Sequence, residues 1–527
     1  MSVLTTYASL AADPTTQAVV HWIEDATSAR SLWYGEGTPN TEVVASVSSQ
    51  GLSGVTYAGR RVYTAKVSGL TPATTYTAEI RDGATVVGTC AFHTFPTQLS
   101  SSSSTRVGFC SDLHMDQLVA EIDFSGMAAW GPDILCVIGD VITDGNSSAS
   151  ASAERWMHFF TEWVEPVSDA KGHLVPVVLA VGNHEVGAPS DWTGVGEVTW
   201  DGYYPRLLFA NPGDLDPVGE NYGAVTVGDY LQLLILDSHT CEAVTLGAWL
   251  EGAIDDSVLL ALPIMHSPLV ITTNRDAGQD DLTTNLRNAL VETLYDAGNV
   301  RYWFAGHLHL RKRTVRLGVS ATDPGNSFQL ASGKFVVEDP AGFREIGDGY
   351  RYNRTPFNAA SYWYLDWTEN GDEGQFHGLI LTPTSVTAST WDQSDEEIWE
   401  EGVALTGYEP DDDFEYQLEI RPAGGEWELL ADWMAGEDIG DGLRRWSDGE
   451  WGDYPPGDTS LRIRARDARD ESQPTEWHTI EVSVGEGVAP PTGLSATGIS
   501  TSQIEVDWDT VAGDTRYDLR YRLSGGP

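Results

Sequence analysis

The chain has 527 residues, a formal net charge of −48 and a sequence isoelectric point near 4.3. A surface this acidic excludes general affinity for nucleic acids or anionic membranes. It favours adaptation to molar salt, where charge repulsion is screened, because the acidic excess is spread over every segment rather than gathered in a tail. The alternative is an acidic protein adapted to nothing in particular. No apolar run reaches the length of a transmembrane helix, and residues 1–16 lack a secretory signal pattern.

The length predicts three or four domains, and the four cysteines show neither metal-binding nor disulfide spacing. Residues 1–98 consist of short alternating strands broken by turns, which predicts a β-sandwich. A turn at Leu70-Thr71-Pro72 precedes a strand that opens on Tyr76, as at the corner of a fibronectin type III-like domain. A serine-rich linker is predicted at 99–105.

Residues 106–385 alternate strands with helical stretches, at 154–164 and 285–295 among others, and therefore predict an α/β layer fold. Five predicted strands, at 106–110, 134–138, 176–181, 259–265 and 301–305, each end in Asp, Asn or His. In chain order these end residues are Asp112 and His114; Asp140; Asn183, His184 and Glu185; His266; and His307 and His309. Because ligand sites of α/β sheets lie at the carboxyl ends of their strands, the pattern predicts a metal site.

A long segment without clear periodicity lies between Glu185 and Tyr222. It holds Trp192, Trp200, Tyr203, Tyr204 and Arg206. Loops of this length in a compact domain are usually functional, so we expect the segment to form one wall of a substrate cleft. Arg206 is equally consistent with a plain surface salt bridge.

The C-terminal region is predicted to be β-rich. Residues 414–420 and 460–466 alternate with period two, so a second sandwich is expected at 386–487. Pro490-Pro491 is predicted to be a linker, and residues 488–527 are expected to hold the start of a further, incomplete fibronectin-like domain. The natural chain is therefore expected to continue past Pro527.

The ordered motif set resembles the calcineurin-like metallophosphoesterase family. The motifs are Asp112-x-His114, Gly139-Asp140, Gly182-Asn183-His184-Glu185, His266 and Gly306-His307-x-His309. The similarity extends to the purple acid phosphatases, which carry a fibronectin-like domain before the catalytic one. Residues 70–76 and 92–96 are similar to the end of that domain, and residues 234–238 and 247–250 are similar to the segment before the family's next histidine. It departs at Thr143, where purple enzymes have a tyrosine ligand, and at His114, which they lack. The resemblance therefore implies a colourless site.

The resemblance also implies the roles of the motif residues. One metal would be held by Asp112, His114, Asp140 and His309, and the other by Asp140, Asn183, His266 and His307. His184 would then hydrogen-bond the phosphoryl oxygens or protonate the leaving group. Asp144 and Glu185 would orient ligands, and surface capping is an equal alternative for each. Two divalent ions (Mn, Fe or Zn) held in this way can activate a bridging hydroxide for attack on a phosphate ester.

Two functions follow as hypotheses. The first is a metal-dependent phosphoesterase acting on an extracellular or surface phosphate ester. The second is a structural or adhesive component of a virion tail or cell surface, in which sandwich modules bind a partner and the central domain is secondary or inactive. An extracellular or virion location is expected, with the cytoplasm of a halophile as the alternative. The fold class expected in either case is an N-terminal β-sandwich, a central α/β metallophosphoesterase domain and C-terminal β-sandwiches.

Overall fold

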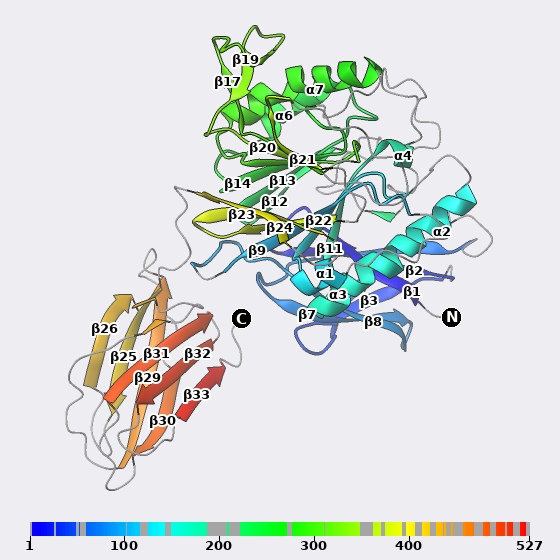
Figure 1. Ribbon diagram of the computed structural model, residues 1–527. Coiled ribbons are helices and arrows are strands. Elements are labelled where there is room, and N and C mark those ends of the chain that lie inside the picture. Colours follow the sequence, from blue (N-terminus) through cyan, green and yellow to red (C-terminus); the bar gives the residue numbers. More distant parts are fainter. Residues whose placement is uncertain are drawn as a thin grey trace. The chain divides into compact units, whose positions relative to one another are not determined.

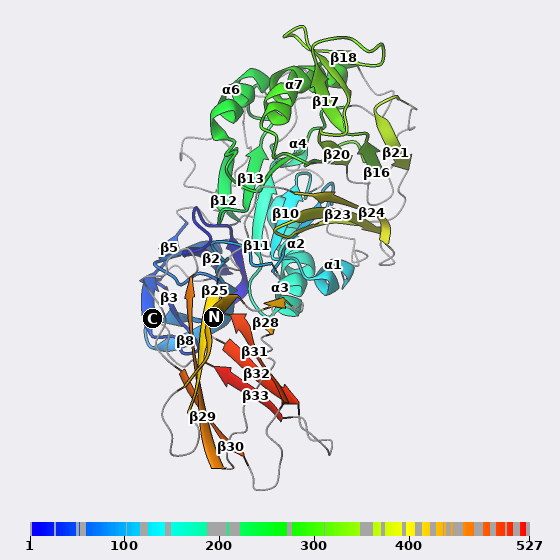
Figure 2. The same cartoon turned by 90° about the vertical axis from the view of Figure 1, so that its left-hand side faces the viewer.

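A computed structural model shows how these segments are arranged (Figure 1, and Figure 2 after a quarter turn). The residues that it describes are 3–25, 28–48, 52, 59–101, 103–115, 125–142, 149–186, 208–209, 222–270, 277–309, 311–347, 362–369, 375–392, 397–405 and the C-terminal strands bounded below. The chain divides into two compact units. Unit 1 comprises Met1–Thr97, Thr105–Leu381 and Ser385–Gly407, and unit 2 is chiefly Tyr408–Pro527.

The N-terminal part of unit 1 is built from strands in two layers. The strands are β1 (Val3–Ser9), β2 (Gln17–Glu24), β3 (Ser31–Gly35), β4 (Thr41–Val44), β5 (Ser46–Val47), β6 (Arg61–Ser68), β7 (Thr75–Asp82) and β8 (Thr85–His93). One layer has the order β4-β3-β7-β8 and the other β1-β2-β6-β5, and they share one apolar core. The hydroxyl of Tyr76 accepts a hydrogen bond from the Thr71 backbone N–H at 2.9 Å, at the predicted corner. Membership of the fibronectin class stays a prediction.

Strand β1 joins this region to the central domain. It pairs in parallel with β11 (Pro176–Ala180), with Ala8 opposite Pro176. The resulting sheet of ten strands has the order β24-β23-β22-β9-β10-β11-β1-β2-β6-β5. The sequence predicts a separate sandwich followed by a linker, whereas in the structure one layer of that sandwich is continuous with the central sheet.

The first half of the central domain places three parallel strands under helices. The strands β9 (Thr105–Cys110), β10 (Ile134–Ile138) and β11 pair side by side. The helices are α1 (Ser125–Trp130), α2 (Ala149–Phe159), the π-helical segment η1 (Phe160–Val164) and α3 (Glu165–Lys171). Trp156, Phe160 and Trp163 are buried in the core of this half, as the predicted helix at 154–164 required.

The second half is a sheet of seven strands in the order β12-β13-β14-β15-β20-β16-β21. Their bounds are β12 (Gly223–Val227), β13 (Leu231–Leu236), β14 (Leu260–Met265), β15 (Tyr302–Ala305), β16 (Arg311–Thr314), β20 (Arg344–Gly347) and β21 (Leu365–Glu369). Helices α6 (Ala243–Ala253) and α7 (Ala277–Asp296) cover it (Figure 1), beside a small sheet of β17 (Leu317–Ser320), β18 (Phe328–Gln329) and β19 (Phe335–Glu338). The rings of Phe109 and Phe304 stack at 3.9 Å, so the two sheets face each other.

Three late strands extend the first sheet. Strand β22 (Gln375–Leu381) pairs antiparallel with β9, and β23 (Ser385–Asp392) and β24 (Glu397–Ala404) follow outward. The boundary expected after residue 385 therefore differs from the structural one, because these strands complete the central sheet. Period-two alternation does not tell which sheet a strand joins.

Unit 2 is formed by strands throughout its described residues. They are β25 (Phe414–Arg421), β26 (Glu428–Ala435), β27 (Glu437–Asp438), β28 (Arg444–Arg445), β29 (Gly457–Asp467), β30 (His478–Val484), β31 (Thr492–Ser500), β32 (Gln503–Asp509) and β33 (Tyr517–Arg522). The predicted strands at 414–420 and 460–466 lie in β25 and β29, which pair antiparallel. The sheet β31-β32-β33 belongs to the same compact unit, although a boundary was expected near residue 488. Within the described residues, no helix has the length and apolarity needed to cross a bilayer.

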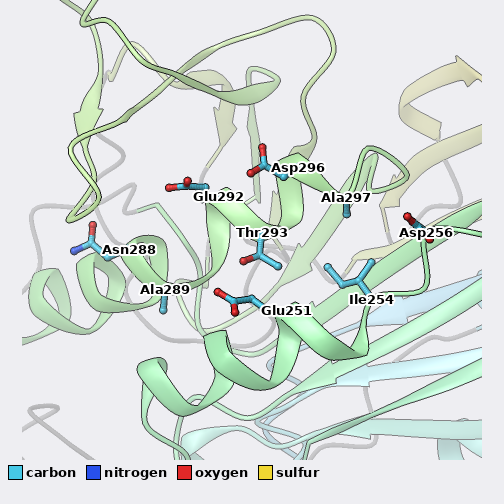
Figure 3. A pocket seen from close by; sticks show the side chains of 9 residues that line it. All are labelled: Glu251, Ile254, Asp256, Asn288, Ala289, Glu292, Thr293, Asp296 and Ala297. Atoms are coloured by element: carbon cyan, nitrogen blue, oxygen red, sulfur yellow. The ribbon is translucent and has the colours of Figure 1, made fainter.

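A hollow of about 600 Å³ lies between α6 and α7 and is lined by Glu251, Asp256, Glu292 and Asp296, among others (Figure 3). These residues lead into the amino ends of β14 and β15. The predicted ligands follow the carboxyl ends of the same strands, so this acidic hollow lies at the opposite end of the sheet from the site described next.

Candidate metal centre

The loops after five strands bring the eight predicted site residues to one place. Strands β9, β10 and β11 of the first sheet carry Asp112, His114, Asp140, Asn183 and His184, with Asn183 opening the short helix α4 (Asn183–Val186). Strands β14 and β15 of the second sheet carry His266, His307 and His309. Because the two sheets face each other with these ends on the same side, side chains far apart in sequence meet.

The first group of possible ligands consists of Asp112, His114, Asp140 and His309. All four are buried, and one ligand atom from each lies within 4.8 Å of the others. Nε2 of His114 and Nε2 of His309 are 3.0 Å apart, and Nε2 of His309 is 3.3 Å from Oδ1 of Asp112. Such convergence of nitrogen and oxygen donors suits a divalent cation.

The second group consists of Asp140, His266 and His307, again within 4.8 Å of one another and buried. Nε2 of His266 lies 3.1 Å from Oδ2 of Asp140. Oδ1 of Asn183 completes the group, at 2.9 Å from Nδ1 of His307 and 3.2 Å from Nε2 of His266. Asp140 is thus common to both groups.

The backbone at these ligands is unusual. Apart from Ala73, every described non-glycine residue with positive φ is a possible ligand: Asp112 (55°), His114 (44°), Asp140 (51°), His307 (76°) and His309 (53°). A left-handed conformation costs a non-glycine residue of the order of 1 kcal/mol or more, so such residues persist where the surroundings enforce them. The strained backbone conformations are therefore concentrated at the residues whose side chains form the site.

Two glycines permit the close approach of the loops. A Cβ atom on Gly139 would lie 2.6 Å from Nδ1 of His266, and one on Gly306 would lie 1.8 Å from Oγ of Ser111. Gly139 also has a φ of 75°. A side chain at either position would therefore push ligand loops apart.

Glu185 fixes the loop that carries Asp140 through hydrogen bonds to its backbone. Its Oε2 accepts hydrogen bonds from the backbone N–H groups of Asp140 and Gly182, both at 2.8 Å, and its Oε1 accepts one from Val141 at 2.7 Å. Burial, followed by the charge of Asp140, raises the pKa of Glu185 to about 7. The suggestion that Glu185 orients ligands therefore has a geometric basis, exerted through the backbone.

Hydrogen bonds aim the ligand atoms. The Nδ1–H of His266 donates to the carbonyl oxygen of Ile138 at 2.7 Å, which leaves Nε2 facing Asp140. Oδ2 of Asp112 accepts the backbone N–H of His307 at 2.8 Å. Oδ1 of Asp112 is buried and accepts no hydrogen bond among the described residues. This orphaned oxygen, among converging imidazoles, fits a cation ligand.

The charges of the site favour cation binding. Burial alone would raise the pKa of Asp140, but the charges of His266 and His184 and a hydrogen bond from His266 hold it well below its usual range. Burial lowers the pKa of His114 to about 3, whereas the Asp140 charge, overcoming burial, raises that of His266 to about 10. Deprotonated carboxylates and a neutral imidazole are the forms that bind metal, and a cation would displace the proton of His266.

His184 adjoins the first group without belonging to either. Its backbone N–H donates to Oδ1 of Asp140 at 2.8 Å, and its ring lies edge-on to His114 at 4.7 Å. Nε2 of His184 is 3.8 Å from Oδ2 of Asp140, and 20% of its side chain is exposed, whereas that of His266 is fully buried. His184 therefore borders the open side of the cluster.

One residue at the site was missed. His239 follows β13, and its ring centroid lies 5.5 Å from that of His266 and 5.9 Å from that of His307. The sequence does contain a signal for His239, because it is a polar residue that follows an apolar strand, as in the other five loops. Thr143, Asp144 and the aromatic segment predicted to line the cleft lie outside the described residues.

Comparison with known proteins finds a family match over most of the central domain. Residues 105–311, which hold every residue of the site, match the family model for calcineurin-like phosphoesterases. The solved structure of PhoD has a TM-score of 0.51 and 11% identity over 83% of this chain and 93% of that one, which indicates a shared fold. A comparison with curated proteins found no match.

Two further structures are less similar. Vacuolar Protein Sorting 29 from Cryptosporidium parvum has a TM-score of 0.24 and 12% identity over 58% of this chain and 99% of that one. A predicted phosphoesterase from Streptococcus pneumoniae has a TM-score of 0.22 and 9% identity over 57% and 98%. Scores this low do not establish a common fold.

Proposed function

We propose that the chain is a dinuclear-metal-dependent phosphoesterase that hydrolyses a phosphate ester. The observation that carries the proposal is the double membership of Asp140. Oδ2 of this buried carboxylate lies 3.1 Å from Nε2 of His266 in the second group and 4.0 Å from Nε2 of His114 in the first. Two adjoining cation positions bridged by one carboxylate are what metal-assisted phosphoryl displacement requires. The family match of residues 105–311 supports the same reaction class.

The two positions divide the ligands as follows. Asp112, His114, Asp140 and His309 would hold one ion, and Asp140, Asn183, His266 and His307 the other. When bound, two divalent cations (Mn, Fe or Zn) supply Lewis-acid stabilisation of the phosphoryl oxygens and a water of lowered pKa as nucleophile.

The protein's own contribution is positioning and proton transfer. Glu185 fixes the backbone of the Asp140 loop, so the shared carboxylate does not need to reorganise during the reaction. His184, at the open side, donates a hydrogen bond from its ring to a phosphoryl oxygen or a proton to the departing alcohol oxygen. A monoester and a diester both satisfy these requirements.

A substrate panel on the metal-loaded protein tests the proposal. Phosphate mono- and diesters are offered in high salt, which suits a chain of net charge −48. The parent is compared with His184→Ala and with His173→Ala, a half-buried histidine that stacks on His93 away from the site.

His184→Ala should lower kcat by roughly 10²-fold or more while the bound metal and thermal unfolding stay as in the parent. His173→Ala should leave kcat unchanged. A parent that hydrolyses no ester with Mn, Fe or Zn would overturn the enzyme proposal, and a His184→Ala variant as fast as an active parent would overturn the role given to His184.

A further inference from the structure

His239 is a half-buried histidine that the proposed mechanism leaves unused. It lies in the loop between β13 and α6, and its ring is tilted against those of His266 and His307. It is therefore adjacent to the second ligand group, whereas His184 adjoins the first. The site thus has one non-ligand imidazole beside each group.

Local hydrogen bonds fix the His239 loop. Oδ1 of Asp237, a fully buried residue, accepts the backbone N–H groups of His239 at 2.8 Å and of Thr240 at 3.0 Å. Oγ of Ser267 lies 3.2 Å from Nε2 of His239. Ser267 directly follows His266, so the His239 ring is tied to the same loop as a ligand.

The same bonds select a tautomer of His239. The hydroxyl of Ser238 donates to Oγ of Ser267 at 2.7 Å, which leaves the Ser267 hydroxyl hydrogen to be donated to Nε2 of His239. A neutral imidazole that accepts at Nε2 carries its proton on Nδ1. Among the described residues, Nδ1 of His239 has no hydrogen-bond partner, so this N–H is available to a ligand.

We propose that His239 is a substrate-positioning residue, whose Nδ1–H donates a hydrogen bond to a phosphoryl oxygen bound at the second ligand group. The inference rests on the proposed function and deepens it. His184 and His239 would then contact the tetrahedral phosphoryl group from the two ends of the cluster. Nε2 of His239 is occupied by Ser267, so His239 positions the phosphate and does not act as a ligand.

Phosphate binding tests this role without relying on turnover. The full chain is loaded with Mn²⁺, and the Kd of inorganic phosphate is measured by titration calorimetry in high salt for the parent, His239→Ala, His239→Asn and His239→Gln. The amide nitrogen of Asn stands near the place of Nδ1, and that of Gln near the place of Nε2. His173→Ala is the matched control away from the site.

We expect His239→Ala to weaken phosphate binding about 10-fold, the value of one hydrogen bond to a charged group. His239→Asn should recover most of this loss, whereas His239→Gln should not, and bound manganese should be equal in all variants. In the ester assay, KM should rise with little change in kcat. A purely structural role would not separate Asn from Gln.

Three results in the variants would overturn the proposal. They are an unchanged phosphate Kd in His239→Ala, a rescue by Gln rather than Asn, and a loss of manganese in His239→Ala, which would make the residue a ligand. A parent that binds no phosphate overturns it as well. A parent that binds phosphate but hydrolyses no ester removes the proposed function alone, and the Asn and Gln variants then still decide the role of His239.

Discussion

The N-terminal sandwich and the central site bury histidines and carboxylates equally deeply, but they do so in different ways. In the sandwich, His21 is 2% exposed and its two ring nitrogens lie 3.0 Å from the hydroxyls of Thr64 and Ser9. Glu24 is paired there with Arg30 at 2.7 Å. In the site, Asp140 instead meets several imidazoles, on a left-handed backbone. Burial is thus common to both regions, whereas clustering of imidazoles around a carboxylate and a left-handed backbone distinguish the candidate metal centre.

The largest expected difference is between variants of two buried carboxylates, Asp140 in the site and Glu24 in the sandwich. Asp140→Asn removes the charge shared by both groups, so bound metal should fall from about two ions per chain to below one, and kcat/KM by roughly 10³-fold or more. Glu24→Gln should keep metal and activity but lower the free energy of unfolding by about 2–3 kcal/mol, because Arg30 loses the buried one of its two charged partners and keeps only the exposed Asp82, at 3.1 Å. Elemental analysis, ester hydrolysis and denaturant unfolding are measured on both. Full metal content in Asp140→Asn would contradict the shared-ligand assignment.

A second variant asks whether the strained loop depends on its support. Glu185→Ala would leave at least three buried backbone N–H groups without an acceptor, and we expect unfolding free energy to fall by about 3–5 kcal/mol, since each lost partner costs about 1–3 kcal/mol. Metal affinity should fall with it. Glu292→Ala, which breaks a surface pair with Lys334 and a hydrogen bond with Ser332, should cost less than about 1 kcal/mol. Equal losses in the two variants would remove the special role of Glu185.

The smallest effect is a pH dependence confined to the sandwich. Burial, aided by the charge of Lys66, lowers the pKa of His21 to about 3, below its ordinary value of 6.5. The unfolded chain therefore binds the extra proton first, and stability should fall as pH drops below 6.5, by up to about 1.4 kcal/mol per pH unit. Between pH 7.0 and 5.5, His21→Gln should lose about 1 kcal/mol less stability than the parent. Denaturant unfolding at both values measures this, and parallel curves would contradict it.

Local sequence patterns located the site because its residues directly follow individual apolar strands. The seven residues of the two groups follow five apolar runs within a few residues, and the family resemblance, read on these positions, assigned them to the two groups. His239 also follows an apolar strand, β13, but the family resemblance on that strand covers only 234–238, so His239 was not predicted. The support from Glu185 was suggested by its position next to His184, but its backbone partners depend on how the β10 and β11 loops pack.

The domain plan was harder to predict because sheet pairing is non-local. The alternating pattern of 385–404 is equally suited to a sandwich or to an added edge, and only its pairing with β22, which lies beside β9, decides the matter. The same holds for Ala8 opposite Pro176, since nothing in β1 itself encodes a partner so far along the chain. Turns such as that before Tyr76 were predictable because they depend on adjacent residues alone.

The pairing of β1 with β11 also determines how long β1 lacks a neighbour on one side during translation. On the ribosome, β1, β2 and β6 are complete early, but the parallel partner of β1 emerges roughly 170 residues later, a delay of roughly 10 to 30 s at ordinary rates of translation. During that interval the nascent sandwich presents an open strand edge, which is prone to pairing with other chains. Strand β1 can gain its parallel neighbour only after β11, which lies just before Asn183 and His184, has been synthesised.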